Sequence, residues 1–217
     1  MVIAYLYSDL LNLYGNDGNI KILCNKLKEL GQEVEIVTPT VNDKMVFENY
    51  DFIYMGSGTE KSIEIALNDI KRYRDDINEA VKANKMFLIT GNSIDIFGKR
   101  IKGSITQDGL GIFNYESIET ERIKKDSIYE ATFLKEPILG FENHNYKIVN
   151  NENLLWNKEG VHYKKFYGTY LEGPILVRNP HFLKHILFEL TNNNKVNSLD
   201  FELEMKAYNN FKEILSV

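Results

Sequence analysis

The chain contains one cysteine, Cys24, among its 217 residues. A single thiol excludes an internal disulfide and any metal site built from several cysteines. Apolar residues recur around Cys24 at helical spacing, at Ile20, Leu23 and Leu27, and Gly31 supplies a stop. We therefore interpret Cys24 as a helix residue beside the core rather than as a nucleophile.

The chain also lacks a long apolar run and an excess of positive charge. The apolar start, residues 1–7, is interrupted by Ser8 and Asp9, well short of a signal sequence or a membrane-spanning helix. The formal net charge is −5 and the basic residues are scattered, so there is no electrostatic footprint for nucleic acid. These absences predict a cytoplasmic protein with no membrane insertion and no nucleic-acid partner, and we expect no cofactor and no metal ion.

The first ninety residues alternate between strand and helix patterns. With 43% hydrophobic residues the chain is long enough for one substantial core, and we expect a single domain over residues 1–217. Strands that alternate with helices indicate a parallel sheet covered on both faces. The sequence therefore predicts a three-layer α/β fold whose central sheet is mostly parallel. The predicted strands are 2–7, 33–37, 51–55 and 86–90, and the predicted helices are 19–30 and 61–83.

The pattern changes in the second half of the chain. Between residues 109 and 170, short runs of strand-forming residues at 127–133 and 135–141 are separated by Asn and Gly clusters. We expect these runs to add antiparallel strands to the edge of the sheet. Pro180 after Asn179 is typical of a helix start, and two C-terminal helices are predicted at 180–191 and 199–215.

Two glycine-containing turns follow predicted strands. Gly91-Asn92-Ser93 comes directly after residues 86–90, an arrangement of strand, sharp turn and helix that exposes a nucleophile in many hydrolases. Gly56-Ser57-Gly58 follows residues 51–55, and its backbone N–H groups could bind an oxyanion or a carboxylate. A third polar turn, residues 12–19, leads into the first helix, for which we predict Asn19 as the N-cap.

Five segments in the same order over residues 5–180 resemble the cobyric-acid-synthase-like branch of class I glutamine amidotransferases. They are YLYSDLLNLYGNDGNI, DFIYMGSGTE, MFLITGNSIDIFG, GFENH and YGTYLEGPILVRNP. Within that branch the segments resemble those of the amidotransferase subunits of lipid II isoglutaminyl synthase. This resemblance implies a flavodoxin-like fold, glutamine hydrolysis, and transfer of ammonia to a Mur-ligase-like partner subunit that amidates the peptidoglycan stem peptide.

The sequence departs from that family at both positions that carry its chemistry. Gly91 stands where the related C-G-G segment has its cysteine, and Glu172 stands where the related G-T-Y-L-H-G-P segment has its histidine. Glycine has no side chain with which to attack an amide. A carboxylate with an ordinary pKa of about 4.3 is a poor proton acceptor compared with imidazole. The sequence therefore predicts a catalytically degenerate glutamine amidotransferase-like protein.

Two other functions stay open at this stage. Ser93 in the Gly91-Asn92-Ser93 turn resembles the nucleophile of the serine peptidases of the same superfamily. Alternatively, Glu172 makes the former glutamine pocket acidic, so the chain could bind glutamine or another small amine without hydrolysing it. In either case the residues that we expect to bind a ligand are Gly56, Ser57, Gly58, Asn92, Arg122, Glu142 and His144.

Overall fold

The structure is a computed structural model that describes residues 1–152, 156 and 159–215. Its central sheet has the strand order β2-β1-β3-β4-β10-β9, in which all neighbours are parallel except β10 and β9. Strands β3 and β4 are fully buried, as their uninterrupted apolar sequences predict. The strands are β1 (Val2–Tyr5), β2 (Glu35–Val37), β3 (Phe52–Met55), β4 (Met86–Thr90), β9 (Val161–Tyr163) and β10 (Phe166–Thr169).

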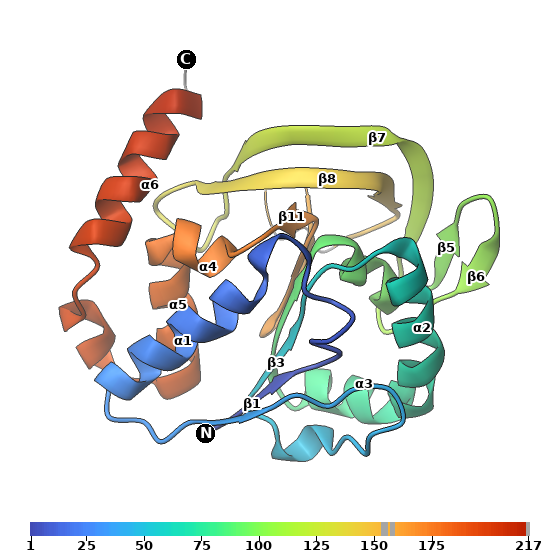
Figure 1. Ribbon diagram of the computed structural model, residues 1–217, viewed down its shortest axis with the longest axis horizontal. Coiled ribbons are helices and arrows are strands. Elements are labelled where there is room, and N and C mark those ends of the chain that lie inside the picture. Colours follow the sequence, from blue (N-terminus) through green and yellow to red (C-terminus); the bar gives the residue numbers. More distant parts are fainter. Residues whose placement is uncertain (153–155, 157–158, 216–217) are drawn as a thin grey trace.

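Helices cover both faces of this sheet (Figure 1). On one face, Leu23 of α1 and Phe182 of α5 share a core cluster with Tyr54 of β3. On the other face, Leu67 of α2 shares a cluster with Ile53, the neighbour of Tyr54. This alternation along a strand confirms the predicted three-layer α/β fold. The α-helices are α1 (Asp17–Glu29), α2 (Glu60–Ile70), α3 (Arg74–Lys82), α4 (Ile175–Arg178), α5 (Pro180–Thr191) and α6 (Glu202–Leu215), and the 3₁₀ turns are Leu13–Gly15, Phe47–Asn49, Lys71–Tyr73, Gly91–Phe97 and Asn194–Ser198.

The prediction that residues 127–133 and 135–141 extend the edge of the central sheet is wrong. Within these runs only residues 127–129 and 138–141 form strand, as parts of the longer strands β7 (Glu116–Tyr129) and β8 (Ile138–Val149). Strands β7 and β8 belong to a second sheet with the order β11-β8-β7-β5-β6. The exposed stretches of β7 are polar and charged, so it lacks the apolar alternation that marks a strand in the sequence. The remaining strands are β5 (Arg100–Lys102), β6 (Thr106–Asp108) and β11 (Leu171–Glu172), and of the described strands only β9 adds an antiparallel edge to the central sheet.

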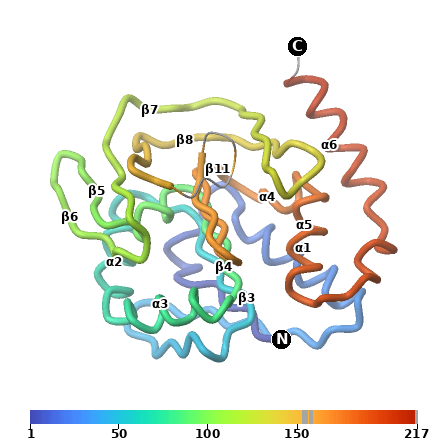
Figure 2. The backbone as a smooth tube through the Cα atoms, turned by 180° about the vertical axis from the view of Figure 1, so that it is seen from behind, coloured from blue at the N-terminus to red at the C-terminus, as the bar shows by residue number. Residues whose placement is uncertain are grey.

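The second sheet lies across the carboxyl ends of the central strands, as both views show (Figures 1 and 2). Strand β11 follows β10 after a single residue and pairs with β8, with Glu172 opposite Phe141. The chain therefore brings the ends of β3, β4 and β10 beneath β7 and β8. Among the helices that the structure describes, none is both long and apolar enough to cross a membrane.

Candidate functional site

The candidate site lies where three neighbouring parallel strands end. The turn of Gly56, Ser57 and Gly58 follows β3, Gly91 follows β4, and Glu172 lies just beyond β10. Since β3, β4 and β10 are adjacent and parallel, their carboxyl ends meet at one edge of the sheet. This edge is where folds of this type place ligands.

Gly91 and Glu172 are in direct proximity. Gly91 has a φ of +63°, a left-handed conformation that glycine adopts without strain. A β-carbon placed on Gly91 would lie 2.8 Å from Oε2 and 2.9 Å from Oε1 of Glu172. The two positions at which the family resemblance places a nucleophile and its base therefore face each other, but Gly91 has no side chain and residue 172 is a carboxylic acid.

Ser57 fills the space beside Gly91. A β-carbon on Gly91 would overlap with Cβ of Ser57. The Ser57 hydroxyl accepts a hydrogen bond from Nδ2 of Asn16 at 2.8 Å, and both side chains are fully buried. The serine side chain is therefore fixed where a nucleophile at residue 91 would begin.

The side-chain amide of Asn92 forms hydrogen bonds with both backbone polar groups of Gly58. Its Oδ1 accepts a hydrogen bond from the N–H of Gly58 at 3.1 Å, and its Nδ2 donates to the Gly58 carbonyl at 2.8 Å. The Gly58 N–H, which we expected to bind an oxyanion or a carboxylate, therefore already has an acceptor.

Glu172 is a buried acid with an unusual titration. Glu172 is 4% exposed, and its burial raises the pKa of its carboxyl group to about 7. The hydrogen bond with the Ser57 hydroxyl and the positive charge of His144 lower this pKa, but burial has the larger effect. Its Oε2 has no hydrogen-bond partner among the described residues. Burial therefore makes Glu172 retain its proton to a higher pH than an exposed glutamate does.

Ser93 is placed as a structural residue. It is fully buried, and its hydroxyl donates to the carbonyl of Gly56. Residues 91–97 form a 3₁₀ turn rather than the start of an α-helix, so no long helix dipole is directed at this position. This geometry does not present the Ser93 hydroxyl to a substrate.

A cavity of about 500 Å³ opens beside Glu172. It brings together the predicted residues Gly58, Asn92, Arg122 and His144, whereas Gly56 and Ser57 are buried and do not line it. Arg122 reaches the cavity from β7, where its Nε donates to Oδ1 of Asn143 at 2.9 Å. The other lining residues are Leu13, Tyr14, Thr59, Glu60, Thr120, Asn143 and Asn145.

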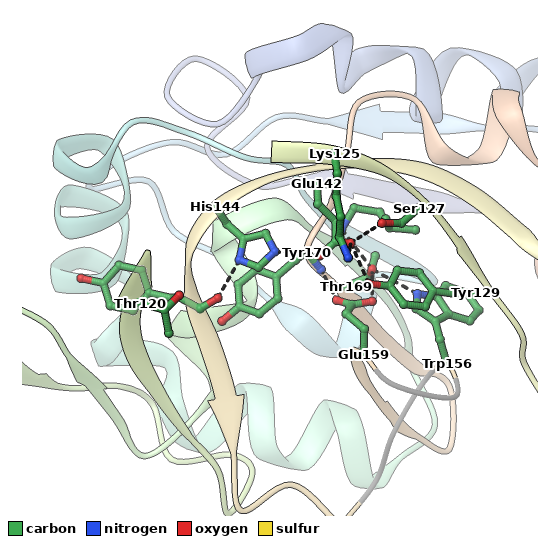
Figure 3. A network of polar contacts seen from close by, with 12 residues as sticks. Thr120, Lys125, Ser127, Tyr129, Glu142, His144, Trp156, Glu159, Thr169 and Tyr170 are labelled. Atoms are coloured by element: carbon green, nitrogen blue, oxygen red, sulfur yellow. Dashed lines mark hydrogen bonds and ion pairs between the residues drawn. The ribbon is translucent and has the colours of Figure 1, made fainter. Parts of the chain in front are cut away.

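Glu142 belongs to a network of polar contacts that includes residues of the second sheet (Figure 3). It also lines a separate cavity of about 310 Å³. It accepts hydrogen bonds from Ser127 and Tyr129, and it pairs with Nε2 of His144 at 3.0 Å. Although burial raises the pKa of Glu142, the hydrogen bonds from His144, Ser127 and Tyr129 lower it to about 2. Glu142 is therefore ionised and fully engaged within this network.

His144 links the two cavities and carries the charge that balances Glu142. Its ring stacks on Tyr170 with the centroids 4.1 Å apart, and its Nδ1 contacts the carbonyl of Tyr146 at 2.6 Å. Since a carbonyl and a carboxylate both accept, both ring nitrogens donate. Burial lowers the pKa of His144, but the hydrogen bonds to Glu142 and to the Tyr146 carbonyl outweigh it and raise the pKa.

The sequence patterns do not predict the roles of several residues that position the site. Asn19 lies inside α1 instead of capping it, because the helix begins at Asp17. Its amide donates to the Gly173 carbonyl at 3.1 Å and accepts from the N–H of Leu176 at 2.8 Å, which fixes the turn after Glu172. Buried Glu159, whose pKa burial raises to about 7, also lacks a sequence signal. For Ser57 the signal is its place between the two glycines of the Gly56-Ser57-Gly58 turn.

Comparisons with known proteins agree with this geometry. Residues 2–180 match the CobB/CobQ-like glutamine amidotransferase domain. The chain is 29% identical over 205 residues to the GatD subunit of lipid II isoglutaminyl synthase (glutamine-hydrolyzing) of Staphylococcus aureus, covering 86% of this chain and 83% of that one. It is also 29% identical over 203 residues to the GatD subunit of Streptococcus pneumoniae, covering 82% and 75%. A crystal structure of a glutamine amidotransferase superposes with a TM-score of 0.57 at 17% identity over 89% of this chain and all of that one, a likeness of fold.

Proposed function

The chain belongs to the family of CobB/CobQ-like glutamine amidotransferase domains, and from this premise we propose that it is a cytoplasmic subunit that no longer hydrolyses glutamine. We propose further that it acts through a Mur-ligase-like partner in the amidation of the peptidoglycan stem peptide. The relatives from S. aureus and S. pneumoniae are named as glutamine-hydrolyzing subunits of lipid II isoglutaminyl synthase. Their similarity over most of the chain supports the assignment of this protein to the same process.

The arrangement around Gly91 is the main support for the proposed loss of glutamine hydrolysis. This residue has no side chain, and Ser57 fills the space where a nucleophile would start. Loss of a nucleophile alone costs about a millionfold in turnover in a comparable hydrolase, or about 8 kcal/mol of barrier. The carboxylate of Glu172 in place of an imidazole, and the occupied N–H of Gly58, remove two further parts of the machinery.

A serine hydrolase that uses Ser93 is the weaker alternative. Its hydroxyl donates to the Gly56 carbonyl in a fully buried position. A nucleophilic serine needs a base that accepts its proton within hydrogen-bond reach. The contact with a backbone carbonyl does not supply one.

A partner role is supported by the segments that still match the related family. The GFENH segment at residues 140–144 and the GTYL segment at residues 168–171 both survive, although the chemical residues have changed. Tyr14 lies at the cavity and is 51% exposed. Exposed aromatic residues of this kind supply much of the binding energy in protein interfaces.

Purification of the tagged full-length chain from its native cell tests the partner role. We expect a Mur-ligase-like protein to copurify, and the variant Tyr14→Ala to recover less of it. Tyr163→Ala is the matched control, because Tyr163 is 39% exposed on β9 and pairs with Phe166 at the opposite end of the sheet. Recovery of the chain only as a free monomer, even after cross-linking, would contradict the proposed partner.

A further inference from the structure

Glu172 is a buried carboxylate that lacks a cation of its own. It is 4% exposed, and its Oε2 has no partner in the part of the chain that the structure describes. The positive charge that acts on it is that of His144, which is already paired with Glu142 at 3.0 Å. Burial of a carboxylate is unfavourable unless a cation or hydrogen-bond donors compensate for its lost hydration.

The cavity beside Glu172 is large enough for a small ligand and lined mainly by polar side chains. Its volume is about 500 Å³, and its lining includes Asn92, Asn143, Thr59 and Tyr14. Glu172 and His144 are its buried ionisable groups, whereas Glu60 and Arg122 lie at its exposed rim. A ligand in this cavity can therefore approach a buried acid that forms no salt bridge within the described part of the chain and whose neighbouring cation, His144, is paired with Glu142.

Glu172 makes the cavity a better match for a cation than for a neutral amide. The Gly58 N–H is held by Oδ1 of Asn92 at 3.1 Å, so this backbone donor is not available to an amide carbonyl. Glu172 adds an acceptor with a formal negative charge, for which an ammonium group is the better donor. The same two features that oppose glutamine hydrolysis therefore favour a cation.

We propose that this cavity binds a small molecule through a side-chain ammonium group that donates to the carboxylate of Glu172. The inference rests on the proposed loss of hydrolysis, because a hydrolytic site would need an imidazole at residue 172. The ligand class is a basic amino acid or a similar small amine. Ornithine is the natural probe, since its side chain matches glutamine in length and ends in an ammonium group instead of an amide.

Calorimetric titration of the full-length protein with ornithine, glutamine and norvaline tests this proposal. We expect ornithine to bind at least about tenfold more tightly than glutamine, because a hydrogen bond to a charged group exceeds a neutral one by that margin. Norvaline has the same aliphatic chain and α-ammonium group but no side-chain amine, and we expect it to bind at least about tenfold more weakly than ornithine. The variant Glu172→Gln should weaken ornithine at least about tenfold and reduce its advantage over glutamine.

The matched control is Glu64→Gln, which removes an exposed carboxylate of α2 that does not line the cavity. We expect this variant to bind ornithine within about twofold of the unmodified protein, because an exposed charge outside the cavity contributes little to binding. The proposal is overturned if ornithine fails to bind at millimolar concentration, if glutamine binds equally well, or if Glu64→Gln loses binding while Glu172→Gln retains it. Release of ammonia from glutamine would instead overturn the loss of hydrolysis, and ornithine, which has no amide, reports on binding alone.

Discussion

The side chain of Ser57 occupies the position that a side chain on Gly91 would take. The two residues lie in successive turns at the ends of β3 and β4, so the space beside Gly91 is filled from the neighbouring turn. Replacement of Gly91 alone therefore cannot restore a nucleophile.

A double-mutant cycle measures this overlap. We expect Gly91→Ala to destabilise the protein by about 2–5 kcal/mol, because the left-handed φ and the overlap with Ser57 both oppose a β-carbon. Addition of Ser57→Gly to the Gly91→Ala variant should recover the part of the lost stability that is due to the overlap between the two side chains. Urea denaturation gives the free energies of unfolding.

The control for that cycle is Gly31→Ala. Gly31 has a φ of +78°, but a β-carbon there meets nothing within 4 Å. Gly31→Ala should lower the free energy of unfolding only by the backbone cost of about 1–2 kcal/mol. This loss should be the same with and without Ser57→Gly. Equal losses of unfolding free energy in Gly31→Ala and Gly91→Ala would contradict an overlap between a residue 91 side chain and Ser57.

Restored glutaminase activity should need three changes together. We expect Gly91→Cys with Glu172→His to stay inactive, since Ser57 obstructs the new side chain. Addition of Ser57→Gly should allow the thiol and the imidazole to act as a pair. Ammonia release from glutamine is the readout, and activity in the double variant equal to that of the triple variant would show that Ser57 is no obstacle.

Glu172 should destabilise the folded protein at alkaline pH. Burial raises its pKa from 4.5 to about 7, so the folded protein retains a proton that the unfolded chain has lost between these values. Stability is therefore lost as the pH rises from about 4.5 to 7. We expect Glu172→Gln to raise the free energy of unfolding at pH 8 by up to about 3 kcal/mol, and to have little effect at pH 4.5.

Thermal and urea denaturation at the two pH values check this expectation. The exposed carboxylate of Glu60 serves as the control, and Glu60→Gln should change stability by less than about 0.5 kcal/mol at either pH. A Glu172→Gln effect that is the same at pH 4.5 and pH 8 would mean that Glu172 titrates normally.

Ser93→Ala should reduce stability without changing any activity. The Ser93 hydroxyl donates to the buried carbonyl of Gly56, and loss of such a donor costs about 1–3 kcal/mol. Ser104→Ala, in the exposed connection between β5 and β6, should have an effect below about 0.5 kcal/mol. A fluorophosphonate probe should not label the native protein, and labelling at Ser93 would revive the serine hydrolase alternative.

The central sheet could be predicted because its signals are local. Phe52–Met55 and Met86–Thr90 are uninterrupted apolar runs, and helices with a clear apolar face separate them. Strand β7 was misplaced because its exposed stretches are charged and its pairing with β8 depends on residues far along the chain. Long-range pairing of a solvated strand leaves little trace in a local pattern.

The candidate site could be predicted only in part. The substituted positions Gly91 and Glu172 follow from the family motifs, and the structure places them in contact distance. The overlap between Ser57 and Gly91 and the bond between Asn92 and Gly58 depend on how two loops meet in space. No spacing within either loop encodes these contacts.

The most direct test of the proposed function is ammonia release from glutamine by the purified, unmodified protein, measured alone and with a Mur-ligase-like partner. We predict no release above the background reaction in either case, because residue 91 has no side chain and residue 172 has no imidazole. Robust release that depends on this chain would contradict the account and would direct attention to Ser93 and Cys24.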